Sequence, residues 1–368
     1  MSTSARLSAT FSLYVGRRFL LSCGVVLFAL AGIILLVEFV ELVRRYNLKH
    51  GVAITVLLQM ALLKLPHLIQ KVVPLGVLFG GMHTFWRLTR SHELVVARAA
   101  GISVWQFLLP AIVIAALIGG FLITVFNPVA SVMLSRQIQI KEKVINRPSS
   151  LLSVSKSGLW LRQSDDQGQS VIHASRVTQD DMHLKDVIIF LYQKDSVFVG
   201  RVDAAEARLE DGYWYLSDVV LTAPGKPAQF KAEHRVKTDW TLSKIQDSFA
   251  NPAAMSFWDL PGFIAVLENA GFSATRHRLY WHSLLAMPIL LCAMVLIASS
   301  FSLRLARRGG VAIYIGSGVL FGFLLFSLSD VVFALGMSAS LPVPLAAWTP
   351  AGFSMLLGLA VILHLEDG

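Results

Sequence analysis

Long apolar stretches without Asp, Glu, Lys or Arg dominate the hydrophobic pattern of this 368-residue chain. They cover residues 19–37, 99–135, 279–303, 309–329 and 331–365. A membrane-spanning helix takes about 20 apolar residues, so each stretch predicts one span, with a turn included in the last. Residues 52–86 predict a further span, although two lysines interrupt it. The pattern therefore predicts six spans.

Residues 148–250, between the third and fourth predicted spans, follow a different pattern. Short segments rich in Val, Ile, Tyr and Trp occur there, namely GLWLRQ, SVIHASRV, DVIIFLYQ, SVFVGRV and YWYLSDVVL. Polar clusters such as DDQGQ and EDG separate them. This alternation predicts an antiparallel sandwich or a partly open barrel. Such a domain either caps the membrane part or accepts a ligand or another sheet, and the pattern leaves both interpretations open.

The stretch MSFWDLPGFIAVLENAG, residues 255–271, predicts an amphipathic helix before the fourth span. Ser256 and Asp259 have the spacing of a capping box, and Gly271 marks the end of the helix. The predicted fold class is a membrane α-helical protein with an inserted all-β domain. Its parts are three spans in 1–147, the β domain in 148–250, a linker with the amphipathic helix in 251–278, and three spans in 279–368.

The distribution of basic residues predicts the orientation. With the N-terminus inside, nine lie at cytoplasmic ends: Arg6, Arg17, Arg18, Arg87, Arg90, Arg98, Arg304, Arg307 and Arg308. The opposite side receives three: Arg44, Arg45 and Lys49. Basic residues favour the cytoplasm, so both termini are predicted inside and the β domain outside. The formal net charge of +9 then reflects topology rather than nucleic-acid binding.

Three ionisable residues of the second predicted span lie on one helix face. Lys64, His67 and Lys71 recur at i, i+3 and i+7, which places them on one face of a helix. An ionised lysine at mid-bilayer costs about 2.5–3.5 kcal/mol on insertion scales. We therefore expect this face to meet a cavity, a partner or the outer membrane interface.

More charges flank the outward ends of the first and third spans. The cations are Arg44, Arg45, Arg136, Lys141 and Lys143, and the acids are Glu38 and Glu41. Basic residues on the outer side are contrary to the positive-inside rule, but their charge favours binding of an anionic amphiphile. The alternative is that snorkelling lysines pair with the two acids. Asp330, in the fifth span, is either functional or a buried carboxyl bonded to a neighbouring helix.

Motifs for catalysis or metal binding are missing from the sequence. It has no G-x-x-x-x-G-K-[ST] loop, no H-E-x-x-H pair and no G-x-S-x-G elbow. No His–Cys cluster suggests a metal, and Cys23 and Cys292 are interpreted as packing residues. We therefore predict a transport or scaffold subunit rather than an enzyme, with no cofactor of its own and dependent on a partner's energy.

The segment RLTRSHELVVARAAGIS, residues 87–103, separates the second and third spans on the predicted cytoplasmic side. Its composition predicts a short amphipathic helix at about residues 88–101. In ABC-type transporters such a helix docks into a groove of the nucleotide-binding subunit and transmits its movement. The alternative is a charged connector that follows the positive-inside rule.

SHELVVARAAGIS resembles the S-E-L-V-V-x-x-A-x-G signature of the lipopolysaccharide-export permeases, the LptF/LptG family. Four further motifs are similar to those of the family in the same order: PSSLLSVSKSGLWLR at the entry to its outward jellyroll, YWHSLLAMPILLCAMVLIASSFS and GSGVLFGFLLFSLSD in its fourth and fifth spans, and LPVPLAAWTP at its sixth. The resemblance therefore runs along the whole chain. The last motif, with SLLS and GLW, favours the LptG branch over the LptF branch.

The resemblance implies a permease subunit of an ABC transporter in the inner membrane of a Gram-negative bacterium. It implies extraction of lipopolysaccharide from the outer leaflet and transfer to a periplasmic bridge towards the outer membrane. The implied partners are an LptF-type permease, an LptB-type ATPase dimer that binds the ATP, and an LptC-type single-span protein. Two alternatives stay open: the LptF-type paralogue, and a membrane scaffold that recruits partners and moves nothing.

The resemblance also implies roles for individual residues. Glu93 matches the coupling-helix glutamate of the family, and His92, Val96, Arg98 and Gly101 are placed with it. Asp330 matches an aspartate of the fifth span, and Glu38 is grouped with it as an intramembrane polar residue. The predicted lipid-binding set is Arg44, Arg45, Lys64, His67, Lys71, Arg136, Lys141 and Lys143. His67 lies where an LptG sequence can carry a lysine, and the helix after span three is about one turn longer than in the family.

Overall fold

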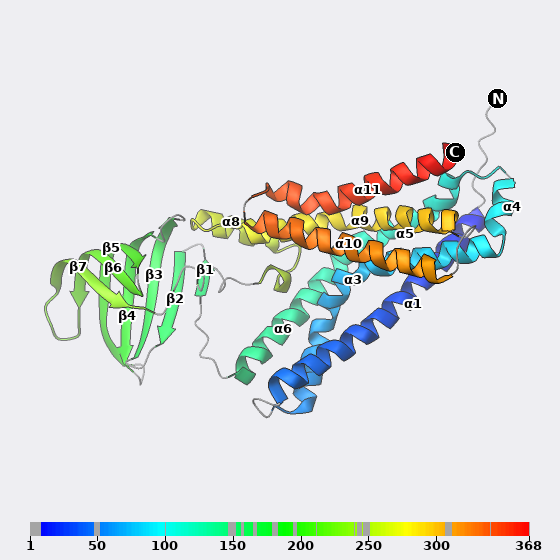
Figure 1. Cartoon of the computed structure of the whole chain (residues 1–368). Coiled ribbons are helices and arrows are strands. Elements are labelled where there is room, and N and C mark those ends of the chain that lie inside the picture. Colours follow the sequence, from blue (N-terminus) through cyan, green and yellow to red (C-terminus); the bar gives the residue numbers. More distant parts are fainter. Residues whose placement is uncertain are drawn as a thin grey trace. The chain divides into compact units, whose positions relative to one another are not determined.

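The chain forms two compact units in a computed structural model (Figure 1). The helical unit comprises Met1–Lys141, Ala253–Phe257 and Arg278–Gly368, and the sheet unit comprises Glu142–Pro252 and Trp258–His277. The structure describes residues 9–47, 52–99, 101–145, 152–155, 158–164, 168–178, 183–193, 197–210, 212–238, 240, 245, 251–305, 311–338 and 340–367. The predicted linker, residues 251–278, is thus divided: its helix groups with the sheet, whereas Ala253–Phe257 groups with the helices.

In the described part of the helical unit, six helices are long and apolar enough to cross a membrane, as the sequence predicts. The first three are α1 (Ala9–Leu42), α3 (Ile54–Arg90) and a continuous helix made of α5 (Val104–Phe121), the π-helical turn η2 (Leu122–Phe126) and α6 (Asn127–Ile145). The others are α9 (Thr275–Leu305), α10 (Val311–Met337) and α11 (Val343–Asp367). A second π-helical turn, η1 (Val43–Asn47), follows α1, and the short α4 (Glu93–Ala99) joins α3 to α5.

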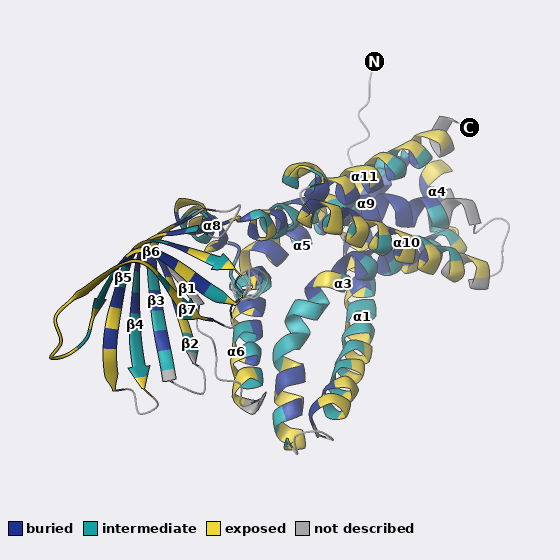
Figure 2. Ribbon diagram, turned by 60° about the vertical axis from the view of Figure 1, so that its left-hand side comes forward, coloured by how far each residue is buried: buried dark blue, intermediate teal, exposed yellow. Residues whose placement is uncertain are grey.

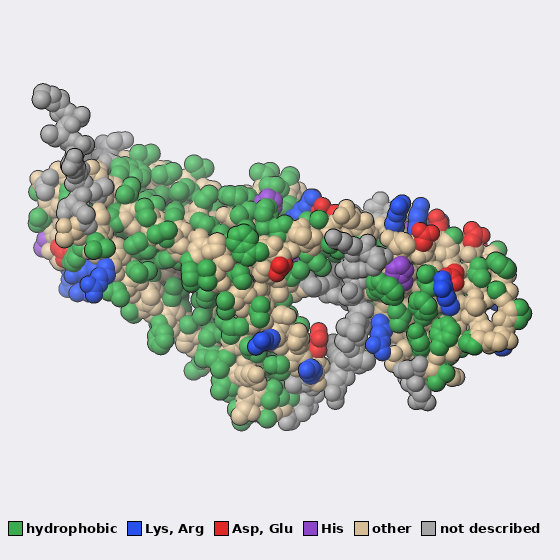
Figure 3. Space-filling view, turned by 180° about the vertical axis from the view of Figure 1, so that it is seen from behind, with side chains coloured by type: hydrophobic (Ala, Val, Ile, Leu, Met, Phe, Trp, Pro, Cys, Tyr) green, Lys and Arg blue, Asp and Glu red, His purple; other side chains and the backbone are tan. Residues whose placement is uncertain are grey.

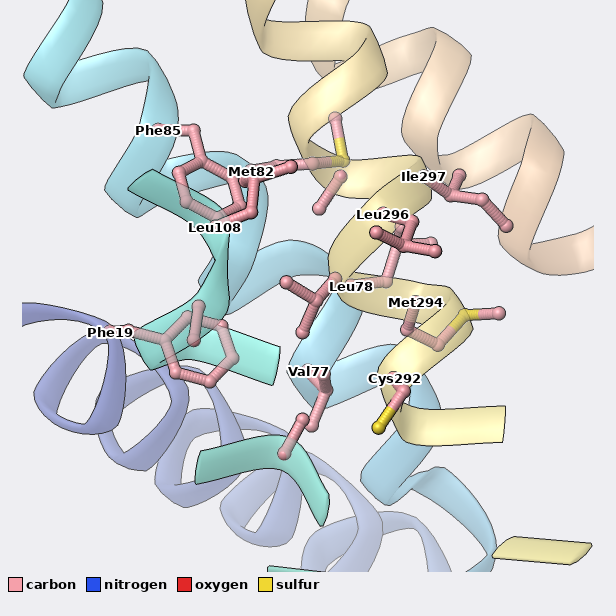
Figure 4. Close-up of a cluster of buried hydrophobic side chains, with 14 of the residues drawn as sticks. Phe19, Val77, Leu78, Met82, Phe85, Leu108, Cys292, Met294, Leu296 and Ile297 are labelled. Atoms are coloured by element: carbon pink, nitrogen blue, oxygen red, sulfur yellow. The ribbon is translucent and has the colours of Figure 1, made fainter. Parts of the chain in front are cut away.

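The core of the helical unit is a cluster of large apolar side chains from α1, α3, α5 and α9 (Figure 4). Phe19, Leu78, Phe85 and Leu108 are almost completely shielded there. Cys23 and Cys292 are buried and unbridged, which confirms the prediction that they are packing residues.

The outer faces of these helices remain apolar and exposed in the single chain. Much of α1 is exposed (Figure 2), including Leu20, Val25 and Phe28. Hydrophobic side chains cover most of the helical unit on the face shown in Figure 3. A large continuous apolar surface of this kind requires lipid or a protein partner to cover it.

Seven strands form one antiparallel sheet among the described residues of the sheet unit. They are β1 (Leu152–Ser155), β2 (Gly158–Ser164), β3 (Gly168–Thr178), β4 (His183–Gln193), β5 (Phe198–Glu210), β6 (Tyr213–Thr222) and β7 (Gln229–Lys237). Each strand pairs with the next along the chain, so the sheet is a meander. All five predicted strand segments are strands, and the predicted fold class of helices with an inserted β domain is confirmed.

The sheet curls so that its second strand meets the end of its last strand. The Gln163 amide on β2 donates a hydrogen bond of 3.0 Å to the Lys237 carbonyl, and the Thr238 hydroxyl donates one of 2.6 Å to Gln163 Oε1. One face of the sheet is apolar, with Ile189 and Trp214 among its buried residues. The structure thus favours the partly open barrel over the two-sheet sandwich.

Helix α8 (Leu260–Asn269) contacts β1 in the same unit, and the two residues after it contact β3. The Val177 amide donates a hydrogen bond to the Ala270 carbonyl, and Gly271 has a φ of +86° beside the Val177 carbonyl, where a Cβ would lie 1.8 Å from that oxygen. Gly271 therefore ends the helix as predicted. The predicted capping box is wrong: Asp259 is the N-cap, and no side-chain hydrogen bond caps the helix there. Residues 253–257, which include Ser256, instead group with the helical unit, as described below.

Candidate functional site

The segment predicted to couple to an ATPase forms a turn followed by the short helix α4. Its two faces differ sharply in exposure. Leu94 and Ala97 are 6% and 7% exposed, and Leu94 belongs to the helical core, whereas Val96 is 67% exposed. His92 and Arg98 are also exposed. Helix α4 is therefore fixed to the bundle on one face and presents the other for binding.

The turn before α4 depends on an unusual backbone conformation. Helix α3 ends at Arg90, and His92 has a φ of 59°, in the left-handed region that few residues other than glycine adopt. Gly101, with a φ of +83°, ends the segment. Ser103 then forms a capping box with Gln106 at the start of α5. Both ends of the segment are thus fixed to the long helices that it joins.

Glu93, the predicted coupling residue, is half-buried and has contacts within the chain. The Ser91 hydroxyl donates a hydrogen bond of 2.9 Å to Glu93 Oε1. The Tyr14 hydroxyl of α1 lies beside the Glu93 carboxylate, and the Arg18 guanidinium lies 4.6 Å from the centre of the Tyr14 ring. Sequence reasoning missed Tyr14, because no local pattern connects it to a segment so far along the chain.

An ion pair between two long helices neutralises one predicted lipid-binding residue. The Lys64 ammonium of α3 lies 2.7 Å from Glu38 Oε1 of α1, and their side chains are 33% and 13% exposed. Arg45 pairs with Glu41 one turn away on its own helix, and both side chains are exposed. The alternative in which lysines pair with the two acids is therefore realised for Lys64 and Glu38, whereas an arginine pairs with Glu41.

The remaining predicted cations differ in exposure. His67 on α3 is half-buried, and both Lys64 and Lys71 interact with it electrostatically, as their shared helix face predicts. Lys141 on α6 is half-buried as well. Four are exposed: Arg44, Lys71, Arg136 and Lys143.

Asp330 lies on α10, where its side chain is exposed. The interpretation of this residue as a buried carboxyl bonded to a neighbouring helix is therefore wrong for the single chain. Helix α10 has few neighbours besides α11, so most of its length, including the position of Asp330, is available to lipid or to another protein.

A buried polar cluster escaped sequence reasoning altogether. Asn127, at the start of α6, lies within 3.4 Å of Gln70 on α3 and of the Tyr280 hydroxyl on α9. Its signal in the sequence is an Asn-Pro pair inside a long charge-free stretch. Such a residue is costly in a membrane unless its amide is hydrogen-bonded.

Six apolar helices, a short helix fixed between two of them and an inserted curled sheet define a multi-pass membrane protein of the permease class. The family model described as lipopolysaccharide export system permease LptF/LptG matches residues 13–364. The chain belongs to this family, as the sequence motifs indicate, and is thus a permease of lipopolysaccharide export rather than an enzyme.

Individual relatives carry the name lipopolysaccharide export system permease protein LptG. The protein of Escherichia coli (strain K12) is 22% identical over 364 residues, which are 95% of this chain and 97% of the relative. The protein of Haemophilus influenzae is 24% identical over 360 residues, 93% of this chain and 95% of the relative. The similarity therefore extends over both units of the fold.

Proposed function

We propose that this chain is the LptG-type permease subunit of an ABC transporter in the inner membrane. It extracts lipopolysaccharide from the outer leaflet and passes it to a periplasmic bridge for delivery to the outer membrane. Both termini lie in the cytoplasm and the sheet unit lies in the periplasm. Support comes from the motifs of the sequence, from the LptG names of relatives that cover 93% or more of this chain, and from the basic residues at the predicted cytoplasmic ends.

The partners follow from what the chain itself lacks. A nucleotide-binding loop is missing from the sequence, so an LptB-type ATPase dimer binds the ATP and supplies the work. An LptF-type permease completes the membrane pathway and covers part of the exposed apolar surface of α1 and α10. An LptC-type single-span protein receives the lipid on the periplasmic side.

The observation that carries this proposal is the geometry of α4. A short helix that is buried on one face at Leu94 and Ala97 and exposed at Val96 can transmit force without unfolding. A rigid-body movement of the ATPase would displace α4, and the fixed connections to α3 and α5 would pass that displacement to the long helices.

Lipid binding uses the basic residues at the outward ends of the helices. Phosphate groups form strong, charge-assisted hydrogen bonds with Lys and Arg. The exposed Arg44, Lys71 and Arg136 can accept such a group directly, whereas Lys64 must first leave Glu38. The Glu38 carboxylate therefore acts as an internal competitor of the lipid phosphate.

Purification of the tagged chain from its native membrane tests the assignment. We expect an ATPase, one further six-span protein of the LptF type, and lipopolysaccharide to co-purify. A second six-span protein of the LptG type would reassign this chain to the LptF position. Isolation as a stable monomer without an ATPase would instead support the scaffold alternative.

A further inference from the structure

Asn127 holds three parts of the helical unit together from a buried position. It is 1% exposed. Its Nδ2 lies 3.4 Å from Gln70 Oε1 and 3.4 Å from the Tyr280 hydroxyl oxygen. Its Oδ1 accepts a hydrogen bond of 2.8 Å from the backbone N–H of Phe257. Since hydrogen bonds weaken beyond about 3.2 Å, the bond to Phe257 is the strongest of the three.

Phe257 belongs to a five-residue segment, Ala253–Phe257, which we call the strap. The strap groups with the helical unit, whereas Pro252 before it and Trp258 after it belong to the sheet unit. The Phe257 ring stacks on the Trp281 ring of α9, with 6.0 Å between the ring centres and 12° between the planes. The strap therefore contacts α6 and α9, and the chain runs from it into the sheet unit in both directions.

The helix that carries Asn127 is fixed on one side of its π-helical turn. In α5, a Cβ on Gly119 would lie 2.5 Å from Pro288 Cα of α9, so the two backbones are in close contact there. The turn η2 (Leu122–Phe126) follows, and Asn127 comes directly after it. Because π-helical turns locally disrupt the regular hydrogen bonding of a helix and often occur at functional sites, η2 is the natural point for α6 to bend relative to α5.

We propose that Asn127 is a positioning residue for transport, which couples movement of α6 to the strap and thereby to the sheet unit. When α6 bends at η2, the two long contacts with Gln70 and Tyr280 break first. The shorter bond keeps Phe257 with α6, so the strap moves and pulls on the chain that enters the sheet unit. The role of Asn127 in transport rests on the proposed function, whereas the contacts of Asn127 do not depend on it.

Hydrogen exchange of the Phe257 amide tests the geometry without any transport. The complete transporter in lipid nanodiscs is compared for wild type, Asn127→Leu and Ser131→Ala. Ser131 is the matched control, because it is buried one turn further along α6 and its hydroxyl donates to the Pro128 carbonyl of the same helix. We expect exchange at Phe257 to rise about tenfold in Asn127→Leu and to stay unchanged in Ser131→Ala. Unchanged exchange in Asn127→Leu would overturn the proposed strap bond.

The number of lipopolysaccharide molecules released per ATP hydrolysed, measured in proteoliposomes, tests the positioning role. We expect this ratio to fall about tenfold in Asn127→Leu and to stay within about twofold of wild type in Tyr280→Phe, which loses one long contact but keeps the Phe257 bond. If Asn127 has a merely structural role, Asn127→Leu lowers the yield of the complex and leaves the ratio unchanged. That result would overturn the inference. Wild-type complex that hydrolyses ATP and releases no lipid would refute the proposed function itself, whatever the exchange rates show.

Discussion

The ion pair between Lys64 and Glu38 illustrates how a single residue acquires its role from a neighbour. A lone ammonium among apolar helices is costly, and the Glu38 carboxylate at 2.7 Å offsets that cost. The spacing of Lys64, His67 and Lys71 predicts a shared face but does not tell which of them is paired within the chain. Lys64 is therefore the residue at which lipid binding and internal packing compete.

Neutralising the competitor should strengthen binding of a phosphorylated lipid. In Glu38→Gln the Lys64 ammonium is free of its partner, so we expect affinity for lipopolysaccharide with phosphorylated lipid A to rise about threefold to tenfold, and in Lys64→Ala to fall by a similar factor. Binding of fluorescent lipid to the purified complex measures both effects. In Glu41→Gln, which releases Arg45 from a pair whose side chains are both exposed, we expect a smaller rise in affinity, because an exposed ion pair contributes little. Equal changes with phosphate-free lipid A would contradict a role in phosphate binding.

Single elements of this fold differ in how fully their local sequence specifies them. The five strands found from alternation have one buried face, whereas none of the residues of β7 is buried. It is a strand because β6 pairs with it along its length. The start of α8 has a local cause: Asp259 is the N-cap, and Pro261 lies in the first turn, where proline is favoured.

Helix α4 allows the coupling role of Glu93 to be separated from its internal contacts. We expect Glu93→Ala to keep the fold, because Leu94 and Ala97 still pack, and to lower the lipid released per ATP by about tenfold or more. Tyr14→Phe removes the neighbouring hydroxyl of α1 but leaves the carboxylate in place, so the lipid released per ATP should stay near the wild-type value. Both ratios are measured in proteoliposomes. If Tyr14→Phe were as defective as Glu93→Ala, the carboxylate would act within this chain and not on the ATPase.

The molecule as a whole depends on close contact between helices that the sequence does not place together. Gly80 of α3 lies directly against α1, where a Cβ would be 2.7 Å from Cys23 Cα and 2.8 Å from its backbone nitrogen. Contact between backbones leaves no flexible side chain that could move aside. The pair α1 and α3, which also carries the ion pair of Lys64 and Glu38, is therefore sensitive to any added volume at this point.

Adding one methyl group at this contact should destabilise the helical unit. We expect Gly80→Ala to lower the free energy of unfolding in detergent by about 1–3 kcal/mol, because α1 and α3 must separate. Gly32→Ala on α1 is the matched control, since a Cβ there meets nothing within 4 Å and alanine favours a helix over glycine. Denaturant titration followed by circular dichroism measures the difference. Similar stability of the two variants would show that α1 and α3 are not in close contact at Gly80.

The sequence by itself determined the features that depend on residues near one another along the chain. Apolar length specified the six membrane helices, alternation specified five strands, and the motif around Glu93 specified the family. Only the tertiary structure decided which distant residues meet: Lys64 with Glu38, Glu93 with Tyr14, and Asn127 with Phe257. The physical reason is that hydrophobic burial follows a local period, whereas a hydrogen bond or ion pair between helices depends on how those helices are placed, which no short pattern encodes.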